Sequence, residues 1–461
     1  MTRAGPLNGR FAVYSDFRRY WFARAASLSG SIVTAVAMPV LVYRLSQSPA
    51  LTALTTALDA LPYLLVGLFA GAMADRWDRK RVMVTADLLN VVVVGSVPAA
   101  WWLGKLTVPH VIVAGLLVMT IFTFFDGANF GALPVLVGRD RVGEANAAVW
   151  GFGGVLDLLL PAGVGVALAV LHPADLLAID ALSYLASALA IRSVSRAMSV
   201  PREGRPPLRA RVVLGDIGEG VRFLWRHAGV RSNTFVGTLQ SIGGAGFIAL
   251  VVPWTDRVLG IGTSGWRFGL IYSAWGVGGI LGSLITPRLL RRTSAARLTL
   301  NAIPISALAG LLVAVSTNWV AATATMTIWG LAYQLVLINS LNYRQQVTPE
   351  HLMSRVNTAG RMLSWGVGWT FGALVGGALA QQVGVRLAMI TMVCFAVLAA
   401  LYARLSPSPL IARAARASAD VSPWKQPRAA GSAARGSIGP SCTRGRFRRS
   451  EAVLRSLRVR G

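Results

Sequence analysis

A short charged turn between two long apolar runs constrains this chain most. The runs cover residues 51–73 and 82–103, and each can cross a bilayer, because about 20 apolar residues span its hydrocarbon core. The turn contains six charged residues: Asp75, Arg76, Asp78, Arg79, Lys80 and Arg81. Cations in a short loop place it on the cytoplasmic side. The interleaved carboxylates add ion pairs that can form in one conformation and break in another.

The composition of the whole chain is that of a membrane protein. Hydrophobic residues make up 54% of the 461 positions, charged residues make up 14%, and the mean hydropathy is +0.57. A soluble domain of this size rarely shows such values. We predict an all-α polytopic membrane protein with twelve transmembrane helices in two pseudo-symmetric six-helix bundles. The predicted helices cover about residues 19–43, 51–73, 82–103, 108–130, 145–170, 176–194, 234–254, 266–286, 298–316, 320–341, 356–380 and 385–405.

These helices divide the chain into five segments. They are a cytoplasmic amino-terminal arm (1–18), the first bundle (19–194), a central cytoplasmic loop (195–231), the second bundle (232–405) and a cytoplasmic tail (406–461). The central loop is rich in Arg and Pro and has an amphipathic piece around residues 217–225. The tail carries 12 basic and 2 acidic residues. Because it has too little apolar surface to fold alone, we expect it to be disordered and to lie against anionic lipid.

The net charge of +27 follows the predicted topology. With both termini in the cytoplasm, 39 of the 45 Lys and Arg residues lie on the cytoplasmic side, which is the positive-inside pattern. The basicity therefore indicates orientation and contact with anionic lipids of a bacterial plasma membrane, and no nucleic-acid partner is expected. No phosphate-binding loop, metal-ligand spacing or catalytic triad occurs in the sequence, so we expect no enzymatic activity, metal or cofactor. We also expect the protein to be a monomer.

The charged turn resembles the signature loop between helices 2 and 3 of the major facilitator superfamily, in the form Asp-Arg-x-Asp-Arg-Lys-Arg. Asp78 stands where the family usually has glycine. Four further stretches resemble the drug-efflux branch that includes macrolide exporters and the enterobactin exporter, namely residues 87–89, 180–184, 269–276 and 347–356. The resemblance extends over about residues 15–405. It implies export of a small compound by alternating access, with the proton gradient as the energy source.

The same resemblance gives the turn a role as a conformational-switch loop. Its residues are Gly71, Asp75, Arg76, Asp78, Arg79, Lys80 and Arg81. By analogy, Asp75 accepts hydrogen bonds from the amino end of helix 11, near Ser354 and Arg355, where the helix dipole favours an anion. The arginines of the loop would pair with carboxylates such as Asp140 or Glu144. The alternative is that these charges only set topology.

Ionisable groups inside the membrane are costly and usually functional. Four carboxylates are predicted to lie in spans and are candidates for proton coupling: Asp59, Asp126, Asp157 and Asp180. Asp157 is the strongest candidate, because Gly154, Pro161 and Gly165 share its helix stripe and allow close approach of another helix. The stretch from Leu160 is similar in part to an antiporter element that begins with glycine. A structural hydrogen bond is the alternative role of Asp157.

The other ionisable residues have competing interpretations. Asp126 is expected to form a structural or gating pair, Asp59 to line an outer cavity beside Tyr63, and Asp180 to pack or cap. Arg24 is expected to extend toward the headgroups or to pair locally.

Five polar or aromatic residues of the second half are candidates for the substrate cavity: Gln240, Trp275, Trp329, Gln334 and Asn339. Because the spans contain few cations, a lipophilic or zwitterionic small molecule (a drug, antibiotic or siderophore-like metabolite) fits better than an anion. Two alternatives stay open. The chain could take up a small metabolite, or it could be a sensor or scaffold that keeps the fold without transport.

Overall fold

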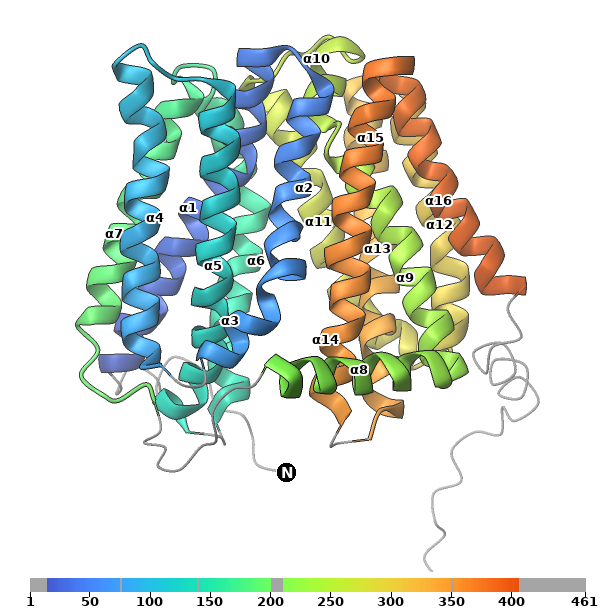
Figure 1. Ribbon diagram of the computed structural model, residues 1–461. Coiled ribbons are helices and arrows are strands. Elements are labelled where there is room, and N and C mark those ends of the chain that lie inside the picture. Colours follow the sequence, from blue (N-terminus) through green and yellow to red (C-terminus); the bar gives the residue numbers. More distant parts are fainter. Residues whose placement is uncertain (1–14, 75–76, 139–140, 200–209, 350–351, 406–461) are drawn as a thin grey trace, which may run out of the picture. The chain divides into compact units, whose positions relative to one another are not determined.

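A computed structural model describes residues 15–74, 77–138, 141–199, 210–349 and 352–405 (Figure 1). The predicted all-helical fold is confirmed, since these ranges contain helices and connecting turns but no strand. Asp75, Arg76 and Asp140 of the proposed switch, together with the basic tail, lie outside the described residues.

The helices follow the predicted order. Those of the first half are α1 (Ser15–Ser46), α2 (Pro49–Leu65), α3 (Gly67–Ala74), α4 (Arg79–Trp102), α5 (Val108–Val137), α6 (Val142–Ala167) and α7 (Pro173–Arg192). The central loop contains α8 (Ala210–Arg226). Those of the second half are α9 (Ala228–Ile248), α10 (Val251–Arg257), α11 (Gly265–Leu290), α12 (Ala295–Val315), α13 (Trp319–Val347), α14 (Met353–Arg361), the π-helix η4 (Met362–Trp369), α15 (Thr370–Val383) and α16 (Val385–Leu405).

Most predicted spans are present as helices that can cross a membrane. Ten described helical stretches are long and apolar enough to cross a membrane. The number is eleven if α9 and α10, which meet at an angle of 43°, together form one further span. The helix predicted over residues 51–73 is divided at Val66 into α2, with 17 residues, and the short α3. Pro62 lies one turn before the break, and proline removes a backbone donor and disfavours a straight helix. The total of twelve spans therefore stays a prediction.

Small and aliphatic side chains fill the space between the helices. One buried cluster joins α1, α4, α5, α6 and α7 around Leu41 and Leu177 and extends to α10 and α11 of the second half. Another joins helices of the second half around Trp254 and Met389. The outward faces carry exposed apolar side chains such as Val92 and Leu182. Such faces are suited to lipid rather than water. The division into two six-helix bundles stays a prediction.

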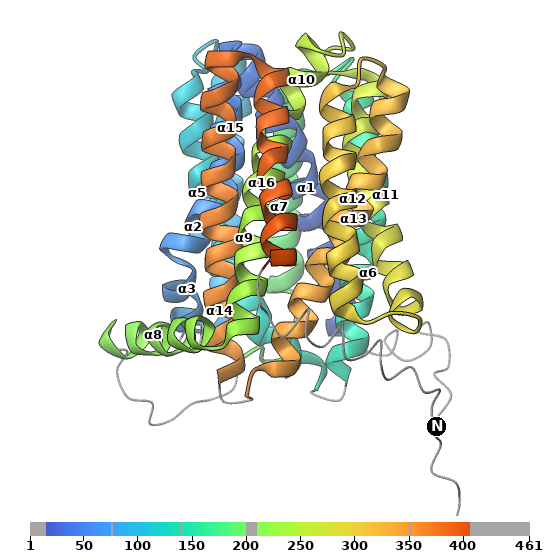
Figure 2. The same cartoon turned by 90° about the vertical axis from the view of Figure 1, so that its right-hand side faces the viewer.

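Helix α8 lies across one end of the long helices, and α10 lies at the opposite end (Figures 1 and 2). We call these the α8 end and the α10 end. The amphipathic piece expected around residues 217–225 is thus confirmed as a helix. Leu224 of α8 packs with Val356 and Ala359 of α14. A Cβ atom at Gly220 would lie 2.5 Å from the carbonyl oxygen of Arg355, so α8 and α14 are in close contact.

Candidate functional site

Two pairs of helices join the first half to the second through small residues. In the crossing of α6 with α11, a Cβ atom at Gly165 would lie 2.5 Å from the Cα atom of Gly269. In the crossing of α2 with α15, a Cβ atom at Gly377 would lie 2.6 Å from the Cβ atom of Ala53. The close helix approach predicted at Gly165 is therefore confirmed. Van der Waals packing drives association of helices in lipid, so glycine pairs favour such crossings.

A polar cluster connects the first half to the second at the α10 end. The Tyr43 hydroxyl donates to Asp256 Oδ2 at 2.8 Å and accepts from Arg257 Nε at 2.9 Å. Arg257 also donates to the carbonyl oxygen of Gln47, which has a positive φ of 52°, an uncommon conformation for a residue with a side chain. We call Tyr43, Gln47, Asp256 and Arg257 the α10-end latch. Beside it, Arg44 Nε donates to Thr263 Oγ1 at 3.1 Å.

Replacement of Tyr43 by Phe is expected to weaken the latch without disturbing the packing of the ring. The variant loses two hydrogen bonds to charged groups, each worth about 1.5–3 kcal/mol. We therefore expect the population with separated α10 ends to rise at least about tenfold. Spin labels on cysteines placed at Leu45 and Gln381, in a chain whose two native cysteines are serine, measure this separation as a longer distance.

Tyr402→Phe is the matched control, since Tyr402 packs on Phe235 in the second half, away from the latch. Its distance distribution should equal that of the parent chain. Identical distributions for Tyr43→Phe and the parent chain would show that the latch does not hold the α10 end closed.

The described part of the switch loop is tied into the first half. The Asp78 carboxylate caps α4, since its Oδ1 accepts from the Arg81 backbone N–H at 2.8 Å. Arg79 is buried, and its Nη1 donates to the Gly131 carbonyl oxygen at 2.7 Å. Lys80 Nζ donates to the Val194 carbonyl oxygen at 2.6 Å. These residues anchor the start of α4 to α5 and to the segment after α7, which is more than a topology signal requires.

Arg355, the expected neighbour of Asp75, is engaged by α8. Its guanidinium forms an ion pair with Glu219. The amino end of α14 is thus linked to the central loop at the α8 end. The contact expected between Asp75 and this helix end falls outside the described residues. Gly71, the first residue of the proposed switch, lies in α3.

Arg24 is the most notable buried charge of the first half. Its side chain is 4% exposed, and its Cζ atom lies 5.2 Å from the centroid of the Phe125 ring. Its Nε and Nη1 atoms donate to none of the described atoms. The interpretation that Arg24 extends toward the headgroups is therefore wrong: α1 continues past it, and α5 covers it. Electrostatic interactions link it to Asp87 and to Tyr63.

Asp87 was not counted among the membrane carboxylates, although it is buried inside α4. The Ser187 hydroxyl of α7 donates to its Oδ2 at 2.6 Å. Asp87 also interacts electrostatically with Asp180. Its position in an apolar run, eight residues after Arg79, was the signal that could have identified it. We call Arg24 and Asp87 the buried charge group.

The four predicted coupling carboxylates lie in different surroundings. Asp180 is fully buried and accepts from Thr34 Oγ1 at 2.5 Å and Ser183 Oγ at 3.0 Å, an arrangement that fits the packing role. Asp126 is half-buried and interacts electrostatically with Tyr63. Asp59 is half-buried on α2, and Asp157 is exposed on α6.

The predicted stripe of small residues is in close contact with α11 at Asp157, Pro161 and Gly165, whereas a Cβ atom at Gly154 would meet no atom within 4 Å. A Cβ atom at Gly276 of α11 would lie 2.8 Å from the Asp157 carbonyl oxygen. Asp157 thus lies on the helix pair that joins the two halves, and its side chain is exposed.

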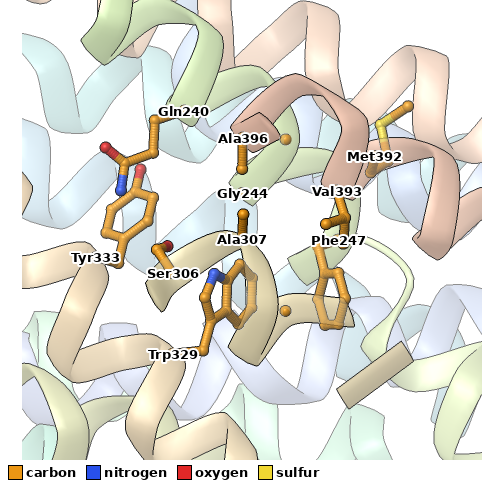
Figure 3. Close-up of a pocket in the computed structure, with 12 residues that line it drawn as sticks. Gln240, Gly244, Phe247, Ser306, Ala307, Trp329, Tyr333, Met392, Val393 and Ala396 are labelled. Atoms are coloured by element: carbon orange, nitrogen blue, oxygen red, sulfur yellow. The ribbon is translucent and has the colours of Figure 1, made fainter. Parts of the chain in front are cut away.

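The substrate candidates of the second half form two groups. Gln240 and Trp329 are buried and line a cavity of about 10 Å³ between α9, α12, α13 and α16, together with Ser306 and Tyr333 (Figure 3). Gln240 Nε2 and Ser306 Oγ have no hydrogen-bond partner among the described residues. The volume is that of about one water molecule, so in this conformation the cavity is too small for a drug-sized ligand.

Trp275 of α11 packs against two of the residues that line this cavity, Trp329 and Tyr333. Its ring lies 4.3 Å from the Trp329 ring and 5.1 Å from the Tyr333 ring, between centroids. Gln334 Nε2 donates to Ser283 Oγ at 3.4 Å. Asn339 is buried, and its amide atoms have no hydrogen-bond partner in the described ranges. The structure thus brings Gln240, Trp275 and Trp329 close together.

The long apolar helices and their close crossings define the class of protein, which is a multi-pass membrane protein. The model of the transmembrane secretion effector family matches residues 10–440, so the chain belongs to this family of the major facilitator superfamily.

Two curated relatives are exporters by name. The multidrug efflux pump Tap of Mycobacterium tuberculosis is 29% identical over 215 residues, which cover 44% of this chain and 49% of Tap. The match with Tap therefore spans about half the length of that relative. The enterobactin exporter EntS of Salmonella typhi is 23% identical over 393 residues, which cover 81% of this chain and 88% of EntS. The relatives are transporters rather than enzymes.

Solved structures with the same fold are also transporters. A bacterial homolog of the human lysosomal transporter Spinster, in an inward-facing and unoccupied conformation, has a TM-score of 0.68 at 15% identity and covers 88% of this chain and 98% of that one. The nucleoside transporter NupG has a TM-score of 0.66 at 14% identity and covers 84% of this chain and 97% of that one. At these identities the likeness shows the fold alone.

Proposed function

We propose that this chain exports a small lipophilic or zwitterionic compound across the plasma membrane by alternating access, as a proton antiporter with both termini in the cytoplasm. The supporting observation is the set of hydrogen bonds that joins the two halves toward the α10 end. Among the described residues, every hydrogen bond from the first half (α1–α7) to the second (α9–α16) lies nearer the α10 end. Such a molecule is closed at the α10 end, and breaking the latch would allow it to open there.

Breaks in two facing helices supply positions for bending. The α2–α3 break at Val66 and the π-helix η4 interrupt the helices that cross between the halves. They lie at one level, since a Cβ atom at Gly366 of η4 would lie 3.1 Å from the Leu64 Cβ atom. Nearby, Arg361 Cζ lies 5.8 Å from the centroid of the Tyr63 ring. π-helical turns are frequent at functional sites. We infer that α3 and α14 move against α2 and α15 here.

Proton coupling needs a carboxylate that changes its surroundings during the cycle. Asp157 fits, because it is exposed here and lies on α6 beside α11, the helix pair that joins the halves. The buried charge group fits a second requirement. A buried cation that interacts with a buried carboxylate in a low-dielectric interior makes protonation of that carboxylate sensitive to its surroundings. In this proposal Asp157 exchanges the proton, and Arg24 sets the charge balance of the first half.

Export is favoured over uptake by the relatives, one a multidrug efflux pump and one an enterobactin exporter by name. A lipophilic or zwitterionic cargo is favoured by the aromatic group at Trp275, Trp329 and Tyr333.

We expect a pump-deficient bacterium that expresses this chain to accumulate less of at least one fluorescent compound in a broad panel. An uncoupler should abolish the difference, because the proton gradient drives antiport. The Asp157→Asn and Asp75→Asn variants should lose most of the efflux at normal expression, since the first cannot exchange the proton and the second cannot form the expected contact at the α8 end. Compound accumulation and drug susceptibility are the measurements.

Asp175→Asn is the matched control, because Asp175 lies in the first turn of α7, at a span end, and accepts from the Trp102 ring N–H. Its efflux should equal that of the parent chain. Efflux that persists with the uncoupler would contradict proton coupling. Net uptake of the compound, or no movement of any compound by a correctly inserted chain, would contradict export and favour the uptake or sensor alternatives.

A further inference from the structure

A membrane-facing groove runs along the first half at the α8 end. It has a volume of about 800 Å³ and lies between α3, α4 and α5. Its apolar walls include Phe69 and Leu89, both about half exposed, and Phe124. Pockets of this size hold drug-sized ligands or lipid chains. The groove lies beside α3, the short helix that the break at Val66 separates from α2.

The length of the groove matches one leaflet of a bilayer. Along α4 its lining extends from Asp78, at the helix start, to Leu89. Eleven residues of α-helix rise by about 16 Å, and half of a hydrocarbon core is about 15 Å. A chain in this groove would therefore run from the membrane surface to the bilayer centre.

The α8 end of the groove has one exposed cation in its described lining, Arg81. Arg79 and Lys80, which precede it, donate to backbone carbonyl oxygens of Gly131 and Val194 and do not line the groove. The single carboxylate of the described lining, Asp78, is engaged as the helix cap. An anionic headgroup at the membrane surface would complement this charge, whereas a cationic headgroup would not.

We propose that this groove binds a phospholipid with an anionic headgroup from the leaflet at the α8 end. The phosphate lies at Arg81, and one acyl chain lies along Phe69, Leu89 and Phe124. The bound lipid fills the space beside α3 and so supports the break in the α2–α3 helix. The proposal does not rest on export, since lipid binding is measured on the purified chain.

The test is native mass spectrometry of the delipidated full-length chain, titrated with phosphatidylglycerol or with phosphatidylcholine. The wild type should bind one phosphatidylglycerol about fivefold more tightly than phosphatidylcholine, the factor expected from roughly one basic contact. Thr85→Trp, which fills the groove from an exposed position on α4, should lose this one lipid. Arg81→Gln should bind both lipids equally.

Leu88→Trp is the matched control, because Leu88 is exposed on the same helix outside the groove lining. It should bind as the wild type does. Equal lipid binding by Thr85→Trp and Leu88→Trp would overturn the site. Equal affinity of the wild type for the two lipids would overturn the anionic headgroup. A panel compound that binds the wild type but not Thr85→Trp, in place of lipid, would assign the groove to the cargo instead.

Discussion

Replacing Arg24 by Met is expected to lower transport at least about tenfold while the chain still inserts into the membrane. Met keeps an unbranched apolar side chain in the buried position, but it lacks the guanidinium that lies over the Phe125 ring and so removes the positive charge. Removal of one charge from a buried pair costs about 3–5 kcal/mol of stability when a partner is left uncompensated. The rate falls tenfold if about 1.4 kcal/mol of this cost differs between the ground state and the transition state of the transport cycle. Efflux from cells, normalised to the amount of chain in the membrane, measures the effect.

Arg18→Met is the control on the same helix, because Arg18 is exposed. It should transport as the wild type does. Arg24→Lys, which keeps the charge, should recover part of the lost rate and so separates loss of charge from loss of folding. Wild-type efflux by Arg24→Met would remove Arg24 from the mechanism.

Gly165→Leu is expected to eliminate transport and to reduce the yield of monodisperse protein. A side chain there would meet the backbone of Gly269 at 2.5 Å, so α6 and α11 must separate. Overpacking costs about 1–3 kcal/mol when side chains can yield, and backbone atoms yield less than side chains. Size-exclusion chromatography and efflux measure the two effects.

The same helix supplies the control. A Cβ atom at Gly163 would meet no atom within 4 Å, so Gly163→Leu should keep yield and transport. Normal behaviour of Gly165→Leu would mean that the α6–α11 crossing is looser than the structure indicates. Equal damage by both substitutions would mean that loss of glycine itself, rather than the crossing, is responsible.

The spans were predictable because their length and composition are local properties. The last predicted helix, 385–405, coincides with α16, and the one expected over 108–130 is α5, which continues to Val137. The break at Val66 and the π-helix η4 were not predicted. Both lie where α2 packs against the helix formed by α14, η4 and α15. They could not be predicted, because contacts between helices far apart in the sequence leave no periodic pattern in it.

The site was only partly predictable for the same reason. A carboxylate among small residues was predicted at Asp157, since helical spacing places Gly165 on its stripe, and the close approach there is confirmed. Arg24 is covered by Phe125 of a different helix. The spacing of residues within one helix does not predict such a contact. The α10-end latch joins Tyr43 to Asp256 and Arg257 across more than 200 residues.

The central claim is that the two ends open in turn, and paired distance measurements test it most directly. Spin labels at Leu45 and Gln381 report the α10 end, and labels at Gly143 and Gln345 report the α8 end, in vesicles where pH and cargo can be set. We predict that the condition that lengthens the first distance shortens the second, and that Tyr43→Phe shifts both in those directions. Two distances that lengthen together, or that stay fixed while cargo is transported, would contradict alternating access.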